Sequence, residues 1–298
     1  MISKEEIKSY FQGLQDEICT ALAQADGKAS FTEDLWERPE GGGGRSRVIQ
    51  DGNVIEKGGV MFSAVWGGLH EKMLASMGLT EKVDFFATGV SIVIHPQSPR
   101  VPIIHMNVRY FEMANGTCWF GGGIDLTPHY VVEEDARWFH QQLKDVCDNH
   151  DVTYYPKFKQ WADDYFFNTH RNETRGVGGI FFDYQKPDEN RSKDDIFAFV
   201  KGVGEAFAPI YTYFMNKNAT IPFSEQEKDF QYLRRGRYVE FNLVHDRGTK
   251  FGLETNGRTE SILMSMPPMA KWIYNYQTEA NSEEEKTLAL LRKGVDWV

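Results

Sequence analysis

Polar side chains alternate with apolar ones along Val101 to Phe111, and the polar members could do chemistry together. The period of two predicts a β-strand with His105, Asn107 and Arg109 on one face, about 7 Å apart. A histidine exchanges protons near neutral pH, and a guanidinium can bind both oxygens of a carboxylate. The pattern therefore predicts a surface that binds an anion and transfers a proton.

The segments on either side of this strand add further candidates. Ser91 and His95 share a face of the preceding segment, and the short loop 96–100 should return the chain as an antiparallel neighbour, with His95 near His105. After the strand, three successive glycines precede Asp125, and glycines let the backbone pass close to a ligand. The run lacks the pattern of a nucleotide-binding loop, so phosphate binding is not predicted. For each histidine alone, a solvated or hydrogen-bonded structural role stays the alternative.

The three strand segments contain the blocks VIHPQSPRVPIIHMNVRYFE and CWFGGGIDLTP. Two later blocks are HRNETRGVGGIFFD at 170–183 and RRGRYVEFNLVHDRGTKFGLETNGRTESILMSMPP at 234–268. In this order and spacing, over nearly the whole chain, they resemble the oxygen-dependent coproporphyrinogen III oxidases.

The resemblance implies conversion of two propionates of coproporphyrinogen III to vinyl groups, with O2 consumed and CO2 released. The product would be protoporphyrinogen IX, in haem biosynthesis, and no organic cofactor is implied. His105 would transfer protons, and Asp125 would hold and deprotonate a pyrrole N–H. The substrate-binding set would be Ser91, Asn107, Val108, Arg109, Asn256, Gly257 and Arg258. One departure is that Asn256-Gly257 stands where the family has a glycine pair.

Metal binding and two other functions stay open on the sequence. Bacterial relatives are described with four histidines as ligands of a divalent metal, manganese or iron; the matching positions are His95, His105, His140 and His170. A metal-dependent oxygenase would instead use His95, His105 and a carboxylate as a facial triad. A non-enzymatic tetrapyrrole or haem carrier is the other alternative. The carboxylate and histidine in the matched blocks favour the enzyme.

The net charge of −10 argues against nucleic acid as a partner, and it requires arginines to gather where an acidic substrate binds. Seven candidates for this role fall in the matched blocks: Arg109, Arg171, Arg175, Arg234, Arg235, Arg237 and Arg258. The alternative for each of them is a pairing with an acidic side chain of the protein itself. We expect about half of them to be paired in this way.

Cysteine content and the N-terminal segment indicate a cytoplasmic protein. Cys19, Cys118 and Cys147 are few and widely spaced, which favours reduced thiols. The first twenty residues have acidic side chains early and lack an apolar core or an arginine-rich character, so a mitochondrial location is the weaker alternative. No stretch approaches the ~18 apolar residues of a membrane span.

Helical spacing and capping boxes predict helices at 3–25, 70–77, 133–150, 158–166, 192–216 and 224–235, and a last one from Ser282. His140 should point inward, His170 should follow the end of the fourth helix, and Pro209 should kink or divide the fifth. Strands are predicted at 60–66, 85–94, 101–111, 117–120, 180–183, 238–245 and 259–266, with a hairpin at 47–57 that turns at Asp51-Gly52.

These elements predict an α+β protein with a large, mostly antiparallel sheet covered by helices on both faces. No repeat or linker divides the sequence, so residues 1–298 are expected to form one domain. The resemblance agrees with this fold, and it also implies a homodimer with contacts near 238–273.

Overall fold

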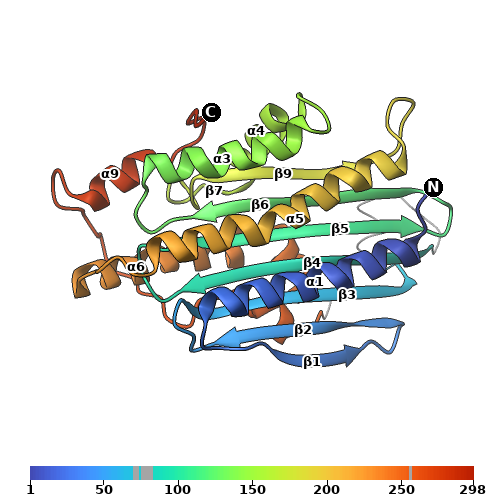
Figure 1. Cartoon of the computed structure of the whole chain (residues 1–298), viewed down its shortest axis with the longest axis horizontal. Helices are drawn as coiled ribbons and strands as arrows, with labels where there is room; N and C mark the ends of the chain where they lie inside the picture. Colours follow the sequence, from blue (N-terminus) through green and yellow to red (C-terminus); the bar gives the residue numbers. More distant parts are fainter. Residues whose placement is uncertain (70–73, 75–82, 255–256) are drawn as a thin grey trace.

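The computed structural model describes residues 1–69, 74, 83–254 and 257–298. Its centre is a seven-stranded sheet in the order β1-β2-β3-β4-β5-β6-β9, with every neighbouring pair antiparallel (Figure 1). The strands are β1 Thr32–Glu37, β2 Gly42–Gln50, β3 Ile55–Gly68, β4 Asp84–Pro96, β5 Ile103–Met113, β6 Cys118–Thr127 and β9 Gly178–Gln185. A separate two-stranded ribbon joins β7 Phe167–Asn168 to β8 Glu173–Thr174.

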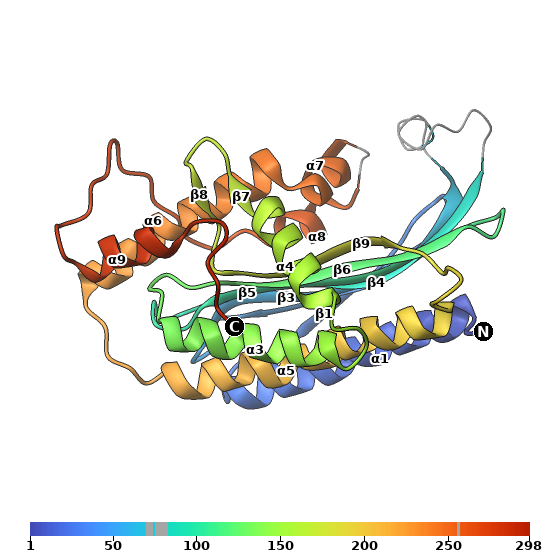
Figure 2. The ribbon, with the colours of Figure 1, turned by 90° about the horizontal axis from the view of Figure 1, so that it is seen from above.

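Helices cover both faces of the sheet, which confirms the predicted α+β class. One face carries α1, α3 and α5, and the opposite face carries α6, α7 and α8 (Figure 2). The helices are α1 Lys4–Asp26, α3 Glu133–Asp148, α4 Tyr154–Tyr165, α5 Lys193–Asn218, α6 Glu225–Glu240, α7 Arg247–Glu254, α8 Thr259–Leu263 and α9 Glu283–Leu290. A π-helical turn, η1 Phe241–His245, continues α6. In the part of the chain that the structure describes, no helix has both the length and the apolar character to cross a membrane.

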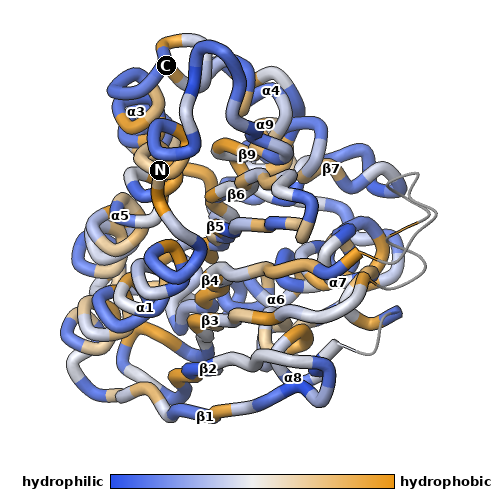
Figure 3. The backbone as a smooth tube through the Cα atoms, turned by 90° about the vertical axis from the view of Figure 1, so that its right-hand side faces the viewer, coloured by the Kyte–Doolittle hydropathy of each residue, from blue (hydrophilic) through white to orange (hydrophobic). Residues whose placement is uncertain are grey.

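The main core lies between the sheet and α1 and α5, and it follows from the alternation along the strands. Met106 and Val108 of β5 are fully buried there, together with Phe11 of α1 and Phe207 of α5. Each such side chain stabilises the fold by about 1.5–3 kcal/mol when it leaves water. Figure 3 views the sheet from its side, where it separates these helices from α6, α7 and α8. The other face of the same strands is therefore free to carry polar side chains.

The predicted helix starts at Ser3, Ser224 and Ser282 and the first hairpin are confirmed, whereas α4 begins at Tyr154, before the predicted residue 158. Reciprocal capping boxes begin α1 at Ser3 and α6 at Ser224, and the Ser282 hydroxyl accepts a hydrogen bond from the Glu285 backbone N–H at the start of α9. The turn between β2 and β3 begins at Asp51, which has a positive φ of 57°. The helix expected at 70–77 lies almost wholly outside the described residues.

The two predicted strands at 238–245 and 259–266 are wrong, because both segments are helical. Residues 238–245 continue α6 through η1, so α6 does not end at Arg234-Arg235 as predicted. Residues 259–263 form α8. The apolar residues of YVEFNLVH fit a period of two, but Tyr238, Phe241 and Asn242 also share one helical face, and that face contacts a buried arginine. Tertiary contacts thus decide against the local β preference.

Two further predictions concern His170 and Pro209. α4 ends at Tyr165, and His170 lies in the turn between β7 and β8, where Asn172 has a positive φ of 54°. Pro209 does not divide α5, which runs unbroken from residue 193 to residue 218. Pro209 lies on the exposed side of that helix, so the carbonyl that loses its N–H partner can bond to water.

Candidate active site

Strand register lines up the predicted residues in rows on the sheet face that is opposite α1 and α5. Arg109 of β5 pairs with Gly89 of β4 on one side and with Gly121 of β6 on the other. In the same way Asn107 pairs with Ser91 and Gly123, and His105 pairs with Val93 and Asp125. His105, Asn107 and Arg109 are all partly exposed, whereas the residues between them are buried, so the predicted shared face is confirmed. The Val108 side chain lies in the core on the other face, so a substrate contact there would come from backbone atoms.

His105, Asp125 and Arg175 form a chain of hydrogen bonds at one end of these rows. His105 Nδ1 lies 2.8 Å from Asp125 Oδ1. Arg175 donates to both oxygens of Asp125, from Nη2 at 2.7 and 2.8 Å and from Nε at 3.1 Å. The side chains of Asp125 and Arg175 are only 1% and 2% exposed, whereas that of His105 is 21% exposed. The histidine is therefore the member of this chain that a bound molecule can reach.

Three aromatic rings and one amide surround the guanidinium of Arg175. Its central carbon lies 4.5 Å from the ring centre of Phe166, 4.7 Å from that of Phe241 and 4.8 Å from that of Tyr238. Its Nη1 donates to Asn242 Oδ1 at 3.1 Å. Cation–π contacts and a carboxylate compensate a buried guanidinium for the water it has lost. The face of α6 and η1 thus holds Arg175 against Asp125.

This environment keeps Asp125 ionised. Burial alone would raise the pKa of Asp125, but the positive charge of Arg175 and the hydrogen bond from His105 outweigh it, so the pKa lies below its usual value. An ionised Asp125 accepts the Nδ1–H of His105 and leaves Nε2 as the basic nitrogen of the neutral ring. The arrangement suits proton transfer at His105 Nε2, with Asp125 orienting the ring. It does not suit direct contact between Asp125 and a substrate N–H, because both oxygens are already engaged.

Arg109 lies further along β5, and two side chains contact its guanidinium. Its Nη1 donates to Asn107 Oδ1 at 2.8 Å, and its Nη2 lies 2.8 Å from Asp183 Oδ2 of β9. The pair crosses β6 above Gly121, where a Cβ would lie 2.5 Å from Asp183 Oδ1 and 2.8 Å from Arg109 Nη2. The first glycine of the run is therefore explained by this close approach. The predicted approach of a ligand to the glycines stays a prediction.

Arg258 lies near the other edge of the sheet, at the start of α8. Its guanidinium pairs with Asp34 of β1, and Nη1 lies 3.3 Å from the hydroxyl oxygen of Ser46 on β2. Gly257 precedes it, and its N–H donates to the Gly252 carbonyl at 2.8 Å. Asn256 lies outside the described residues. The predicted anchors Arg109 and Arg258 thus belong to β5 and α8, on the same side of the sheet.

The seven arginines considered as substrate anchors are all paired with carboxylates of the protein, more than the expected half. The pairs are Arg109–Asp183, Arg171–Glu240, Arg175–Asp125, Arg234–Glu173, Arg235–Glu56, Arg237–Glu240 and Arg258–Asp34. Arg175, Arg234, Arg235 and Arg237 are buried, and Arg171 pairs with Glu240 away from the polar rows. Arg109 and Arg258 are the accessible members beside the rows.

The four histidines that were candidate metal ligands lie in four separate hydrogen-bond networks. His95 Nε2 is 2.8 Å from the Ser265 carbonyl, and buried His140 contacts the Tyr155 hydroxyl and the Val177 carbonyl, whereas His105 contacts Asp125. His170 lies in the turn between β7 and β8. Among the described residues, no group of three His, Cys, Asp or Glu side chains is arranged to hold a metal ion. The four histidines therefore do not fit one shared metal site, and we derive no step through a metal.

The buried histidines should make the fold lose stability below pH 6.5. Burial lowers the pKa of His95 and of His140 to about 3, and it lowers that of His129 well below 6.5. The unfolded chain takes up these protons and the folded chain does not. The free energy of unfolding therefore keeps its full value above pH 6.5 and falls as the pH drops towards 3.

Each such histidine should contribute about 1.4 kcal/mol of lost unfolding free energy per pH unit. Urea unfolding between pH 6.5 and 5 measures the slope, in a window above the titration of Asp125 and the other carboxylates of lowered pKa. His140→Gln should make the slope shallower. An identical slope for His140→Gln would contradict a neutral buried His140.

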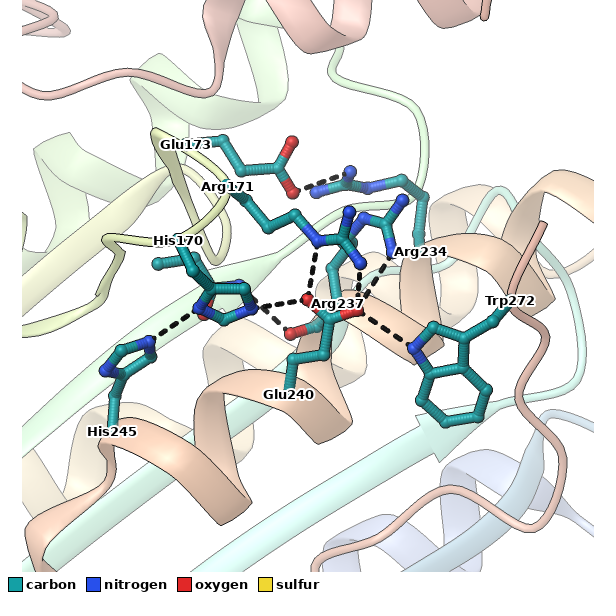
Figure 4. Close-up of polar contacts among 9 residues, drawn as sticks. His170, Arg171, Glu173, Arg234, Arg237, Glu240, His245 and Trp272 are labelled. Atoms are coloured by element: carbon teal, nitrogen blue, oxygen red, sulfur yellow. Dashed lines mark hydrogen bonds and ion pairs between the residues drawn. The ribbon is translucent and has the colours of Figure 1, made fainter. Parts of the chain in front are cut away.

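His170 belongs to a polar cluster centred on Glu240, where α6 meets the β7–β8 ribbon (Figure 4). Glu240 accepts hydrogen bonds from Arg171, Arg237 and Trp272 and lies 2.8 Å from His170 Nε2. Burial alone would raise the pKa of Glu240, but the contacts with Arg171, His170 and Trp272 outweigh it and lower the pKa to about 2. The cluster joins the ribbon to α6 and leaves none of the oxygens of Glu240 free for a ligand.

A cavity of about 500 Å³ lies elsewhere, at the ends of β3, β4 and β5 beside the start of α1. Its described lining includes Lys4, Lys8, Trp66, Asp84 and Glu112 and contains no arginine or histidine. Its charges nearly cancel, and it lacks a group for proton transfer near neutral pH. We therefore place the candidate site on the polar rows and not in this cavity.

Several site residues were missed from the sequence. Asp183 and Asp34 were not predicted, and Arg175 was expected to bind a substrate carboxylate but not to hold Asp125. Tyr238 and Asn242 were assigned to a strand. A helical period for 234–245 would have placed Arg235, Tyr238 and Asn242 on one buried face, which was the available signal. No local signal links Asp183 to Arg109, because the pair depends on the packing of β9 beside β6.

Comparison with known proteins gives one consistent result. A family model described as coproporphyrinogen III oxidase matches residues 6–297. The chain is 46% identical, over 319 residues, to the oxygen-dependent coproporphyrinogen-III oxidase of Prochlorococcus marinus strain MIT 9301, with 99% of this chain and 93% of the relative covered. It is 48% identical over 318 residues to the protein of the same name from strain NATL2A, with 99% and 91% covered.

Proposed function

The chain belongs to the coproporphyrinogen III oxidase family, and we propose that it catalyses the oxygen-dependent decarboxylation of two propionates of coproporphyrinogen III. Each step converts R–CH2CH2COO⁻, O2 and H⁺ into R–CH=CH2, CO2 and H2O2. Two electrons thus pass from the substrate to oxygen, and the product is protoporphyrinogen IX. The observation that carries the proposal is the His105–Asp125 pair beside Arg109 on an exposed sheet face with glycines at three register positions.

In this proposal His105 exchanges protons with the substrate. Asp125 fixes the ring through Nδ1, so Nε2 can take the pyrrole N–H proton and make the ring electron-rich enough to react with oxygen. The role of base that the sequence suggested for Asp125 then passes to His105, with Asp125 acting through it. Burial of Asp125 at 1% exposure supports this division of roles.

The carboxylates that do not react anchor the substrate. We assign this role to Arg109 with Asn107 and to Arg258 with Gly257 and Asn256, with Ser91 as a hydroxyl contact. A guanidinium fork binds both oxygens of a propionate, which fixes orientation as well as position. Four propionates spread around one macrocycle match anchors that lie on different elements of the sheet face.

The experiment that tests the function measures protoporphyrin fluorescence from coproporphyrinogen III in air. The protein is first treated exhaustively with a chelator and analysed for metal. Product without metal is the expected result, with O2 as the co-substrate and the residues of the chain acting alone. Product that forms only after manganese or iron is restored would contradict the assignment of His105 and return the four histidines to metal binding. Binding of porphyrin with no turnover in either case would favour a carrier.

We also propose that the protein is a homodimer in the cytoplasm, with contacts in 238–273 and the whole chain as one domain. Exposed apolar side chains in this region support the interface. They include Leu243, Val244, Phe251, Leu253, Trp272 and Ile273. Exposed apolar side chains in this number along one segment are unusual on a monomer, and the same segment of a second copy would cover them.

Leu243→Asp should convert the dimer to a monomer, because it places a charge in an apolar contact. Light scattering at micromolar concentration measures the mass of the native protein and of the variant. Aspartate at exposed Val152, in the turn between α3 and α4, should leave the mass unaltered. A monomeric native protein would contradict the proposed dimer.

A further inference from the structure

The ion pair between Arg109 and Asp183 occupies the fork that the substrate is proposed to use. Arg109 Nη2 lies 2.8 Å from Asp183 Oδ2, and Nη1 donates to Asn107 Oδ1. The other oxygen of Asp183 accepts the backbone N–H of Tyr184 at 2.9 Å. Asp183 thus presents one carboxylate oxygen to the fork from a fixed position on β9.

The Arg109–Asp183 pair is accessible to solvent. The side chains are 37% exposed for Arg109 and 22% exposed for Asp183, in contrast to the fully enclosed Arg175–Asp125 pair. Gly121 lies directly beneath, and a Cβ at that position would overlap both partners. An exposed ion pair is weak, so another carboxylate can compete for the arginine.

We infer that Asp183 stands in for a substrate carboxylate on Arg109, and that substrate binds by taking Arg109 from it. The inference rests on the proposed function, since it assumes that Arg109 anchors a propionate. When a propionate reaches Nη2, Asp183 loses its partner and faces a second negative charge nearby. Asp183 therefore lowers affinity for the substrate and restricts Arg109 to ligands that bring a carboxylate to the fork. Asp183 is thus a specificity-determining residue, although it was not among the site residues predicted from the sequence.

Asp183→Asn keeps the shape and the acceptor for Tyr184 N–H but removes the competing charge. KM should fall about 3- to 10-fold, the range expected when one exposed ion pair and one like-charge neighbour are removed, whereas kcat should change less than about twofold. Asp183→Ala should lower KM in the same direction. Asp229→Asn removes an exposed carboxylate from Lys271 and serves as the matched control, with KM unchanged.

A second comparison ties the effect to Arg109. In an Arg109→Lys background, Asp183→Asn should alter KM less than about twofold, because the fork for which they compete has gone. A KM that rises in Asp183→Asn, or an equal effect in both backgrounds, would overturn the inference and make Asp183 a support for Arg109. The dissociation constant of oxidised coproporphyrin III, followed by its own fluorescence, tests Asp183 without turnover. Absence of product from the native protein would then refute the proposed function alone.

Discussion

Asparagine in place of Asp125 is expected to lower kcat for propionate decarboxylation by about 10²- to 10⁴-fold, the usual contribution of a proton-transfer group. The side chain keeps its shape, but it no longer favours the His105 tautomer that carries its proton on Nδ1. His105 then no longer presents an unprotonated Nε2 to the substrate. Because Asp125 lies behind His105 and not against the substrate, KM should change much less than kcat.

The measurement is kcat and KM by product fluorescence from pH 6 to 9, alongside thermal unfolding. His105→Ala should give a loss of the same order, and the double variant should be hardly worse than either single one, because the two side chains act as a unit. Asp163→Asn breaks another buried ion pair, with Lys159, and should cost stability but not kcat. Turnover within a few-fold of native in Asp125→Asn would contradict the assigned role.

The sequence predicts the sheet well because the sheet obeys local rules. Alternation along β4 and β5 identifies the face that carries Ser91, His105, Asn107 and Arg109, and the short loop fixes the antiparallel return. Helix starts were predicted for a similar reason, since a capping serine and the acid three residues later satisfy each other within one turn. Such contacts depend on neighbours in the chain.

These local rules do not predict contacts between segments that are distant in the chain. Asp125 meets Arg175 across fifty positions, and Arg175 in turn depends on Tyr238, Phe241 and Asn242 of a segment that reads equally well as a strand. The contacts of these side chains with Arg175 decide that residues 238–245 form a helix and not a strand. The sequence predicted both members of the His105–Asp125 pair but not the burial of Asp125, because alternation does not show which of two cross-strand neighbours a helix covers.

Methionine in place of Arg175 should cost about 3–5 kcal/mol of unfolding free energy at pH 8, because it leaves a buried carboxylate without its partner. Methionine is flexible and apolar, so it can fill the space among the three rings, and the loss would reflect charge more than packing. Asp125 would then be a carboxylate at 1% exposure whose partner charge has gone, and burial would raise its pKa.

The pH dependence separates this explanation from a simple packing defect. In the native protein the pKa of Asp125 is lowered, so its contribution to stability is present at pH 8 and is lost only as the pH falls below its unfolded value near 4. In Arg175→Met the sign reverses, since the folded state would bind the proton more tightly than the unfolded chain. The deficit relative to the native protein should therefore shrink between pH 8 and pH 5, as measured by urea unfolding.

The double variant Arg175→Met/Asp125→Asn completes the argument. It removes both charges, so it should be more stable at pH 8 than Arg175→Met alone, even though it carries one more substitution. Lys159→Met, which leaves Asp163 without its cation at 5% exposure, provides a matched buried pair away from His105. If the double variant is less stable than Arg175→Met, the carboxylate of Asp125 is not the source of the loss. The three aromatic rings around Arg175 would then stabilise the fold mainly by packing, and the ionised state of Asp125 would need another cause.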